Sequence, residues 1–302
     1  MDNHKIWAPI EKVEQGRYLY YYTTYNNAVK ILYYDTLKFS KLNSSNDAFE
    51  QKPKVKFDSK DLALQKMFTQ IHDGFEKIRG NIRILCFSTD AVFEKIQKQY
   101  QEMNLLLSKD LIRENVMGRG FALPRMWAQY ANRNQGVCFV FDKKKLEDRL
   151  KRSRIVFNSR HVDYVTYYKP FEITEKQLNY IQKGINIDPS YFVNQITTSD
   201  SKYINYNYFT KLEDWSSENE YRYITFNNSI VDEDVEISSI SSALCGVVIG
   251  ERMCDVEKYM ISLLLEDSFD GLPLKQIVFE DLTTRIKAVA SSSRKKGSTD
   301  NV

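Results

Sequence analysis

Residues that build metal sites, disulfide frameworks and membrane spans are scarce in this sequence. Its 302 residues include four cysteines and three histidines, which are scattered and form no C-x-x-C pair. This spacing argues against a zinc site and favours a reducing compartment. No stretch approaches the roughly 18 apolar residues of a membrane span, and the N-terminus has no apolar signal region. We therefore expect a cytoplasmic protein without a membrane segment.

An excess of one charge is missing as well. The 43 basic and 40 acidic residues give a net charge of +3 at pH 7. This balance gives no general attraction to nucleic acids or to anionic membranes. Aromatic residues, by contrast, are plentiful, with 20 tyrosines and 17 phenylalanines. They supply a large core and can also line a cleft for a flat ligand.

Strand-like and helix-like segments follow one another without a regular βα alternation. Apolar and aromatic runs predict strands at 17–23, 82–88, 137–141 and 245–250, and helical patterns predict helices at 62–79, 143–152 and 254–265. This mixture predicts an α+β protein. We expect one domain over residues 1–284, with helical insertions at about 58–126 and 171–214. Residues 285–302, rich in Ser and Lys, are expected to form a flexible tail.

The stretch from Trp215 to Phe226 places two carboxylates, Glu218 and Glu220, before an aromatic and β-branched segment. Alternate side chains on a strand share a face, so both acids are predicted to face the same space. Like charges repel there unless a cation, a ligand or water separates them. Arg222 is expected on the same face, where it can pair with one acid and keep it ionised. The stretch is therefore either a solvated strand edge with ordinary surface acids or a functional site.

Two segments resemble motifs of the ADP-ribosyltransferase fold. Residues 19–23, together with 27–32 and Leu37, resemble its first motif, which reads roughly L-W-H-G-S…N…I-L…G-L. Asn219-Glu220-Tyr221 resembles the last motif, whose glutamate is catalytic. Glu218 and Glu220 also match the E-x-E of the arginine-modifying branch. The resemblance implies a single domain with a split, mixed β-sheet core and helical insertions.

More closely, the chain is similar to a bacterial family of unknown function. The shared pattern spans about residues 17–250 and keeps its order along the chain. Its parts are 20–23, 46–50, 86–88, a W-x-x-Y…G-x-C part at Trp127, Tyr130, Gly136 and Cys138, and a W-x-x-E-x-E-x-R part at Trp215, Glu218, Glu220 and Arg222.

The resemblance to the transferases implies NAD as the substrate and Glu220 as the catalytic carboxylate. Cleavage of the nicotinamide–ribose bond passes through an oxocarbenium-like state, as glycoside hydrolysis does. A carboxylate placed at the ribose stabilises the positive charge that develops in that state. Glu218 would orient an acceptor or act as a base.

The same resemblance implies residues that hold NAD. Tyr21 stands where the superfamily has His or Arg, and a phenol hydrogen-bonds without bringing a charge for the pyrophosphate. Candidates for that charge are Lys41, Lys52 and Arg83. The other implied cofactor-binding residues are Tyr22, Thr23, Ser88, Arg222, Trp127 and Tyr130. Each of these residues also has a structural explanation that involves no cofactor. It is sheet core for Tyr22 and Thr23, a helix cap for Ser88, a structural ion pair for Arg222, and helical core for Trp127 and Tyr130.

Three functional hypotheses follow from these residues. The first is a NAD-using ADP-ribosyltransferase-like enzyme, a glycosyltransferase acting on protein, nucleic acid or water, as a toxin or phage-defence effector. The second is a nucleotide-binding or sensing module that kept the fold and lost catalysis. The third is a metal-dependent nuclease in which Asp47, Glu50, Glu218 and Glu220 gather around Mg²⁺. The motifs specify neither an acceptor nor an oligomeric state.

Overall fold

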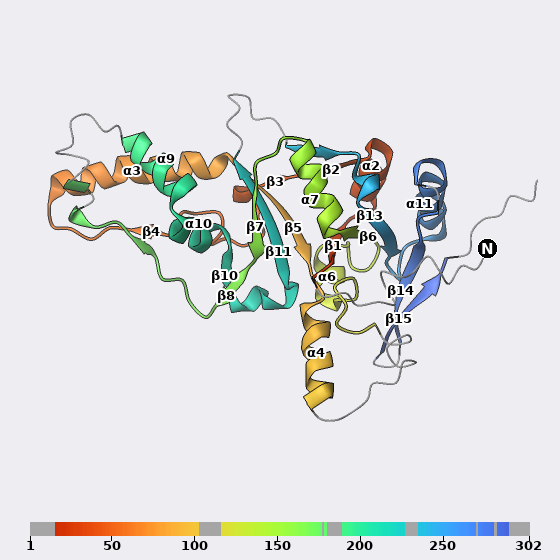
Figure 1. Cartoon of the computed structure of the whole chain (residues 1–302). Coiled ribbons are helices and arrows are strands. Elements are labelled where there is room, and N and C mark those ends of the chain that lie inside the picture. The colour runs from red at the N-terminus through yellow and green to blue at the C-terminus, as the bar shows by residue number, and fades with distance from the viewer. Residues whose placement is uncertain are drawn as a thin grey trace, which may run out of the picture. The chain divides into compact units, whose positions relative to one another are not determined.

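Helices and strands are mixed along the chain in the computed structural model, which confirms the α+β class (Figure 1). The structure describes residues 16–102, 116–176, 178–179, 189–226, 235–269, 271–280 and 283–289. Contacts divide the chain into two compact units. The first unit consists of the described residues within Met1–Thr36, Thr89–Glu147 and Ser239–Val302. The second unit consists of those within Leu37–Ser88 and Asp148–Ser238.

A mixed sheet forms the centre of the first unit. Its strands are β1 (Tyr18–Thr23), β6 (Val137–Asp142), β13 (Leu244–Ile249), β14 (Leu274–Glu280) and β15 (Thr283–Ala288). They lie in the order β15-β14-β13-β6-β1. Strands β13 and β14 are parallel, whereas the other neighbours in this order are antiparallel. The sheet of this unit is therefore mixed, as predicted.

Helices α2 (Tyr25–Tyr34), α4 (Ala91–Glu102), α6 (Pro124–Gln129) and α11 (Asp255–Ser268) belong to the same unit. Helix α2 begins as the sequence predicts, because Thr24 accepts a hydrogen bond from the Asn27 amide with its side chain. Helix α2 packs against α11. Helix α7 (Lys143–Arg152) lies where the chain passes from the first unit to the second.

The core of the first unit gathers side chains of β1, β6 and the segment before and within α6. Tyr20, Tyr22 and Trp127 are buried there, and the ring of Tyr22 meets the indole edge-on at 5.2 Å between centroids. Gly120 lies against this core so closely that an added Cβ would be 2.1 Å from Cδ2 of Tyr20. Close approach of the backbone to an aromatic ring is therefore what requires glycine at this position.

The second unit is built around β5 (Ile82–Ser88) and β11 (Glu220–Phe226), which pair antiparallel. Strand β7 (Asn158–His161) pairs with β11, and β3 (Ser40–Lys41) pairs with β5. Two smaller strand pairs complete it: β4 (Val55–Lys56) with β9 (Phe171–Glu172), and β8 (Asp163–Val165) with β10 (Thr210–Leu212). Strand β2 (Thr36–Lys38), at which the chain passes from the first unit to the second, pairs with β12 (Glu236–Ser238).

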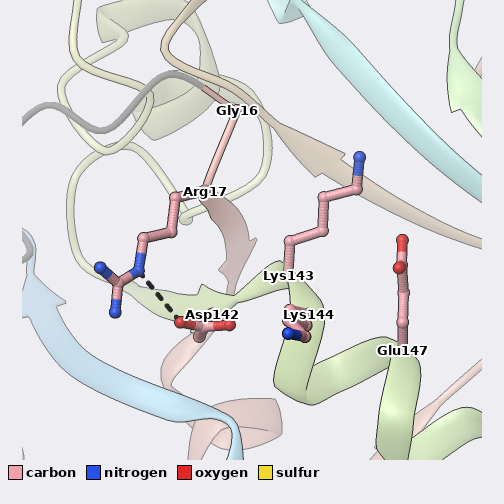
Figure 2. A pocket seen from close by; sticks show the side chains of 6 residues that line it. All are labelled: Gly16, Arg17, Asp142, Lys143, Lys144 and Glu147. Carbon is pink, nitrogen blue, oxygen red and sulfur yellow. Dashed lines mark hydrogen bonds and ion pairs between the residues drawn. The ribbon is translucent and has the colours of Figure 1, made fainter.

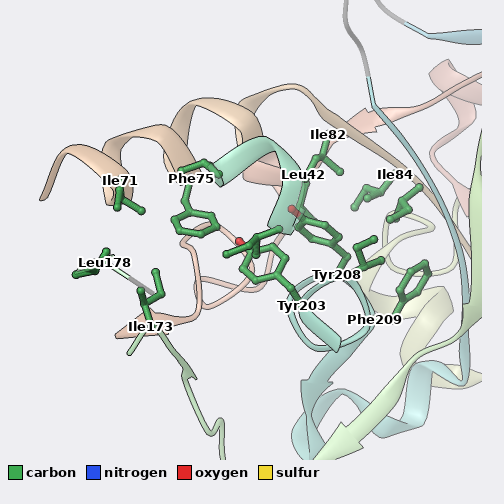
Figure 3. Close-up of a cluster of buried hydrophobic side chains, with 14 of the residues drawn as sticks. Leu42, Ile71, Phe75, Ile82, Ile84, Ile173, Leu178, Tyr203, Tyr208 and Phe209 are labelled. Carbon is green, nitrogen blue, oxygen red and sulfur yellow. The ribbon is translucent and has the colours of Figure 1, made fainter. Parts of the chain in front are cut away.

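Helices α3 (Leu62–Gly80), α9 (Pro189–Ser199) and α10 (Ser201–Tyr208) cover the core of the second unit, and α3 packs against α9. Figure 3 shows this core, in which Phe75 stacks on Tyr203 at 5.2 Å between ring centroids. Tyr203 meets Tyr208 edge-on at 5.7 Å. Each unit thus has a hydrophobic core of its own.

Several predicted elements are confirmed, most of them with boundaries that differ by a few residues, and the predicted start of the tail is wrong. The strand at 82–88 and the helix at 143–152 have the bounds that their patterns predict. The predicted tail, 285–302, begins too early: residues 285–288 belong to β15, where they pair with β14 and where Ile286 packs against the first core. Residues 290–302 lie outside the described residues. The prediction of one domain over residues 1–284 stays a prediction. In the described part of the chain, every helix is too short or too polar to span a membrane.

Candidate functional site

Glu218 and Glu220 lie on different elements, so the prediction that both sit on one strand face is wrong. Glu218 ends a 3₁₀ helix, η3 (Glu213–Glu218), and Glu220 begins β11. Asn219 between them has a φ of 46°, a left-handed conformation that asparagine tolerates better than most residues. The two carboxylates nevertheless meet, because the Lys211 ammonium lies 2.8 Å from an oxygen of each.

Arg222 pairs with Glu220, as the sequence predicts. Its Nε lies 2.6 Å from Oε1 of Glu220 and its Nη2 lies 3.1 Å from Oε2, so the guanidinium holds the carboxylate with two donors. Its Nη1 donates to the carbonyl of Tyr208 at 2.8 Å and lies 2.6 Å from Oε1 of Glu50. The guanidinium therefore joins two carboxylates and one backbone segment.

Glu50 is the third carboxylate of this group. Its Oε2 accepts a hydrogen bond from Ser45 Oγ at 2.6 Å and lies 3.9 Å from Nζ of Lys211. Arg79 donates to the backbone carbonyl of Glu50 from Nε, at 2.7 Å, and from Nη2. These bonds anchor the loop that carries Glu50 to α3. We refer to Glu50, Lys211, Glu218, Glu220 and Arg222 as the charged cluster.

The charged cluster is buried, which contradicts the reading of a solvated strand edge. Glu220 is 4% exposed and Arg222 is fully buried. Burial by itself would raise the pKa of Glu220, but the charges of Arg222 and Lys211 outweigh it and hold that pKa below its usual range. Burial would likewise lower the pKa of Lys211, but Glu220 and Glu50 raise it well above its usual value. Glu220 and Lys211 are therefore both charged at neutral pH.

Strand β5 contributes two further side chains on the face that carries Glu220 and Arg222. Ser88 is the register partner of Glu220, and Cys86 is the partner of Arg222. Directly opposite residues on antiparallel strands point to the same face of the sheet. Burial and the neighbouring Glu220 carboxylate raise the pKa of Cys86 well above its usual value, so it is a neutral thiol. Ser88 Oγ is buried and has no hydrogen-bond partner among the described residues.

Tyr22 and Trp127 lie in the core of the first unit. The hydroxyl of Tyr22 donates to the carbonyl of Gly120 at 2.8 Å. The indole of Trp127 is fully buried and donates from Nε1 to the carbonyl of Phe121 at 2.8 Å. Their polar groups are thus satisfied by the backbone of one short segment. These contacts match the structural roles given above as alternatives to cofactor binding: sheet core for Tyr22 and helical core for Trp127.

The remaining candidates of the first unit are Tyr21, Thr23 and Tyr130. Tyr21 is half-buried and Thr23 is buried, both on β1 opposite residues of β6. Tyr130 is half-buried against the first core. The fold therefore brings Ser88, Glu218, Glu220 and Arg222 together in the second unit, and Tyr22 and Trp127 together in the first.

Sequence reasoning missed Lys211, the cation shared by Glu218 and Glu220. Its local signal is weak: a single lysine in the aromatic run that leads from Tyr208 to Leu212. It also missed Tyr164, whose hydroxyl accepts a hydrogen bond from the Glu220 amide at 3.0 Å. Both contacts join segments whose pairing is not encoded in a local pattern.

Within the described ranges, no group of three or more His, Cys, Asp or Glu side chains could hold a metal ion. Lys211 instead lies between the oxygens of Glu218 and Glu220. The arrangement that the nuclease hypothesis needs, with carboxylates converging on Mg²⁺, is replaced by carboxylates converging on an ammonium group.

A cavity of about 320 Å³ lies elsewhere, in the first unit (Figure 2). It is lined by Gly16, Arg17, Asp142, Lys143, Lys144 and Glu147. Asp142 pairs with Arg17 at 3.1 Å and accepts a hydrogen bond from the Lys145 amide in the first turn of α7. Its carboxylate thus offsets part of the basic lining. The cavity contains none of the site residues that the sequence predicts.

Comparison with known proteins gives one family. The family described as "Protein of unknown function (DUF2971)" matches residues 126–223. This range includes Trp127, Tyr130, Glu218, Glu220 and Arg222, so the similarity to a family of unknown function is confirmed there. No curated protein and no solved structure matches the chain.

Proposed function

We propose that the chain is a NAD-using ADP-ribosyltransferase-like enzyme and that Glu220 acts at the ribose of the substrate. The observation that carries the proposal is the pairing of Glu220 with Ser88 across β11 and β5. These are the residues that resemble the catalytic glutamate and the site serine of that superfamily, at a strand start and a strand end. The fold sets them directly opposite each other, and the hydroxyl of Ser88 is left without a partner in the described part of the chain.

The electrostatics of Glu220 fit the proposed chemistry. Arg222 and Lys211 keep the pKa of Glu220 low, so the carboxylate carries its charge before the substrate binds. A fixed negative charge at the ribose stabilises the oxocarbenium-like state more than the ground state, which is how it accelerates bond cleavage. Arg222 fixes the orientation of the carboxylate with two donors. Glu218 would be the group that orients an acceptor or a water molecule.

The finer fold assignment belongs to the same proposal. Strand β1 forms at the first-motif resemblance and β11 begins at the last-motif glutamate. Both strands therefore have the secondary structure that the motifs require. Tyr21, Tyr22, Thr23, Trp127 and Tyr130 stay predictions as NAD-binding residues, and so do a cytoplasmic location and a role as a toxin or phage-defence effector.

A catalytically inactive nucleotide-binding or sensing module is the second candidate. It is favoured by the ion pairs that Glu220 already makes, because each of its two carboxylate oxygens lies beside a cation. A glutamate that is 4% exposed and paired on both oxygens resembles a structural ion pair as much as a catalytic group. In such a module the charged cluster would fix the shape of the second unit and take no part in bond cleavage.

The experiment that separates the two candidates is nicotinamide release from NAD by the purified protein and by Glu220→Gln. We expect release by the wild type and a loss of at least about 100-fold in Glu220→Gln, since a group that stabilises developing charge contributes on this order. Glu50→Gln is the matched control, because it removes the same charge from the same guanidinium and from an equally buried position. It should retain more activity than Glu220→Gln.

Circular dichroism of both variants establishes that each is folded. Equal losses in folded Glu220→Gln and Glu50→Gln would assign the two glutamates the same structural role and contradict the catalytic one. NAD binding without nicotinamide release, in the presence of cell extract as an acceptor source, would favour the binding module.

A further inference from the structure

Helix α11 carries apolar side chains on two opposite faces. Ile261 and Leu265 are buried, and the helix packs against α2. Four further large apolar side chains recur at i, i+3, i+4 and i+7 and are exposed: Val256 (72%), Tyr259 (41%), Met260 (40%) and Leu263 (37%). At about 100° per residue, these four lie on the side of the helix that faces away from Ile261 and Leu265. We refer to them as the α11 stripe.

The α11 stripe is not what the outer face of a packed helix normally presents. Such a face carries polar and charged residues, whereas a helix that is apolar all round is normally covered on every side. Single exposed apolar residues need no explanation, but several neighbours on one helix face form a patch that marks an interaction site. Tyr33 and Tyr34, at the end of the adjoining helix α2, are exposed as well. The α11 stripe therefore has the character of a contact surface.

Carboxylates stand at both ends of the α11 stripe. Asp255 in the first turn is 99% exposed and pairs with Lys258 at 3.1 Å, and its charge favours the helix dipole. Glu266 and Asp267 are exposed in the last turn, which contains no basic residue. Negative charges there oppose the dipole, so these two acids destabilise the helix that carries them. The stability of α11 does not account for them, whereas a cation brought by a partner would.

The neighbouring helix does not neutralise this charge. Helix α2 contains one charged residue, Lys30, and α11 contains one lysine and four carboxylates. The two helices together therefore carry four negative and two positive side chains. A partner that is basic as well as apolar complements this surface.

We propose that the α11 stripe binds an amphipathic helix of another protein, with apolar residues at matching spacing and basic residues at its ends. Apolar anchors at i, i+3, i+4 and i+7 are the usual means by which two helices recognise each other. A second copy of this chain fits less well, because an antiparallel pair of α11 helices sets Asp255 of one copy against Glu266 and Asp267 of the other. The proposed binding is independent of the transferase function.

Fluorescence anisotropy with a model peptide tests the proposal on the full chain. The probe is a labelled helical peptide of leucine and lysine, with leucines at i, i+3, i+4 and i+7 and lysines at both ends. The comparison peptide has glutamate in place of every lysine. We expect the lysine peptide to bind at least about tenfold more tightly, because like charges that face each other across an interface disfavour binding. Equal affinities would overturn the proposal of a basic partner.

Two substitutions in the α11 stripe locate the binding surface. Val256→Ser/Leu263→Ser should weaken binding of the lysine peptide about tenfold or more, since it removes two apolar anchors. Leu62→Ser is the matched control, because it replaces an exposed leucine on α3 in the second unit and should bind as the wild type does. Equal affinities of the wild type and the double variant would place the peptide elsewhere and overturn the proposal.

The acids of the last turn separate a binding role from a structural one. Glu266→Gln/Asp267→Asn should weaken binding of the lysine peptide about threefold and reduce its dependence on salt, as expected for exposed ion pairs. The same change should raise the melting temperature of the free protein, because it removes two charges that oppose the helix dipole. A lowered melting temperature with unchanged affinity would assign the two acids to the fold and contradict the proposal.

Two other occupants of the α11 stripe are tested by the same proteins. We expect Val256→Ser/Leu263→Ser to leave the sedimentation coefficient unchanged, and Trp7→Ser, in the apolar N-terminal sequence, to leave the affinity for the lysine peptide unchanged. A dimer that the double variant converts into a monomer would assign the stripe to a second copy of the chain. Tighter peptide binding by Trp7→Ser would assign it to the N-terminal residues. Either result overturns the proposal.

Discussion

At the scale of single residues, the buried amine of Lys54 predicts how stability changes with pH. The pKa of Lys54 is about 7 in the folded protein and has its ordinary value near 10.5 in the unfolded chain. Between these values the unfolded chain binds more protons, so folding becomes more favourable as the pH rises. One such proton changes the free energy of unfolding by up to about 1.4 kcal/mol per pH unit.

The comparison of the wild type with Lys54→Met isolates this contribution, because every other titrating group is common to both proteins. Urea unfolding at intervals from pH 6 to pH 10 gives the free energy of unfolding of each. Above pH 7 the wild type should gain stability relative to Lys54→Met, and below pH 7 the difference should be constant. A difference that stays constant throughout would show that Lys54 is protonated in the folded protein at all these pH values.

Gly120 provides a second prediction at this scale. A Cβ added at Gly120 would lie 2.1 Å from the ring of Tyr20 and 2.8 Å from the carbonyl oxygen of Thr89. Tyr20 cannot withdraw easily, because its hydroxyl donates to the buried carboxylate of Asp90 at 2.7 Å. Gly120→Ala should therefore lower the free energy of unfolding by about 1–3 kcal/mol, or more if the segment moves. Gly80→Ala is the control, since nothing lies within 4 Å of its added Cβ. Comparable losses in both variants would contradict the steric argument.

At the scale of elements, the start of α2 depends on Thr24. Its side chain accepts a hydrogen bond from the Asn27 amide at 3.4 Å, which satisfies one of the free amides of the first turn. Thr24→Ala should cost about 1 kcal/mol of unfolding free energy, and Thr24→Ser should cost only a small part of it. Chemical denaturation of the three proteins measures both differences. Equal costs for Ala and Ser would mean that the methyl group and not the hydroxyl matters.

Elements with a strong local pattern could be predicted from the sequence. The helix of residues 143–152 and the strand of residues 82–88 depend on local spacing alone, and both have the predicted bounds. Strand β15 was missed because its stability comes from pairing with β14 and from the packing of Ile286. Its polar alternate residues resemble a solvated tail when they are seen without their partner strand.

The candidate site could be predicted only in part, for the same physical reason. The pairing of Glu220 with Arg222 follows from two residues on one strand. Lys211 reaches the charged cluster through tertiary contacts, so no local pattern indicates it. Glu50 was grouped with Glu218 and Glu220 only by the hypothesis of a shared Mg²⁺, whereas in the structure it lies beside Arg222. The left-handed turn at Asn219 also broke the strand periodicity that placed Glu218 and Glu220 on one face.

At the scale of the whole molecule, two separate cores stabilise the chain, one in each unit. Trp127 is fully buried in the first core and Phe75 is nearly so in the second. Replacing either by alanine should cost about 3–5 kcal/mol, because a large cavity is left in a packed interior. Which segments lose protection should then depend on the core that was weakened.

Hydrogen exchange followed by mass spectrometry resolves this dependence segment by segment. In Trp127→Ala, exchange should accelerate first in β1, β6 and β13, which surround or adjoin the indole's core. In Phe75→Ala it should accelerate first in α3, β5 and α10, which build the second core. The two variants serve as controls for each other, since each removes one buried aromatic side chain. If both variants accelerated exchange equally in all of these segments, the chain would unfold as one cooperative body, and the two cores would not be independent sources of stability.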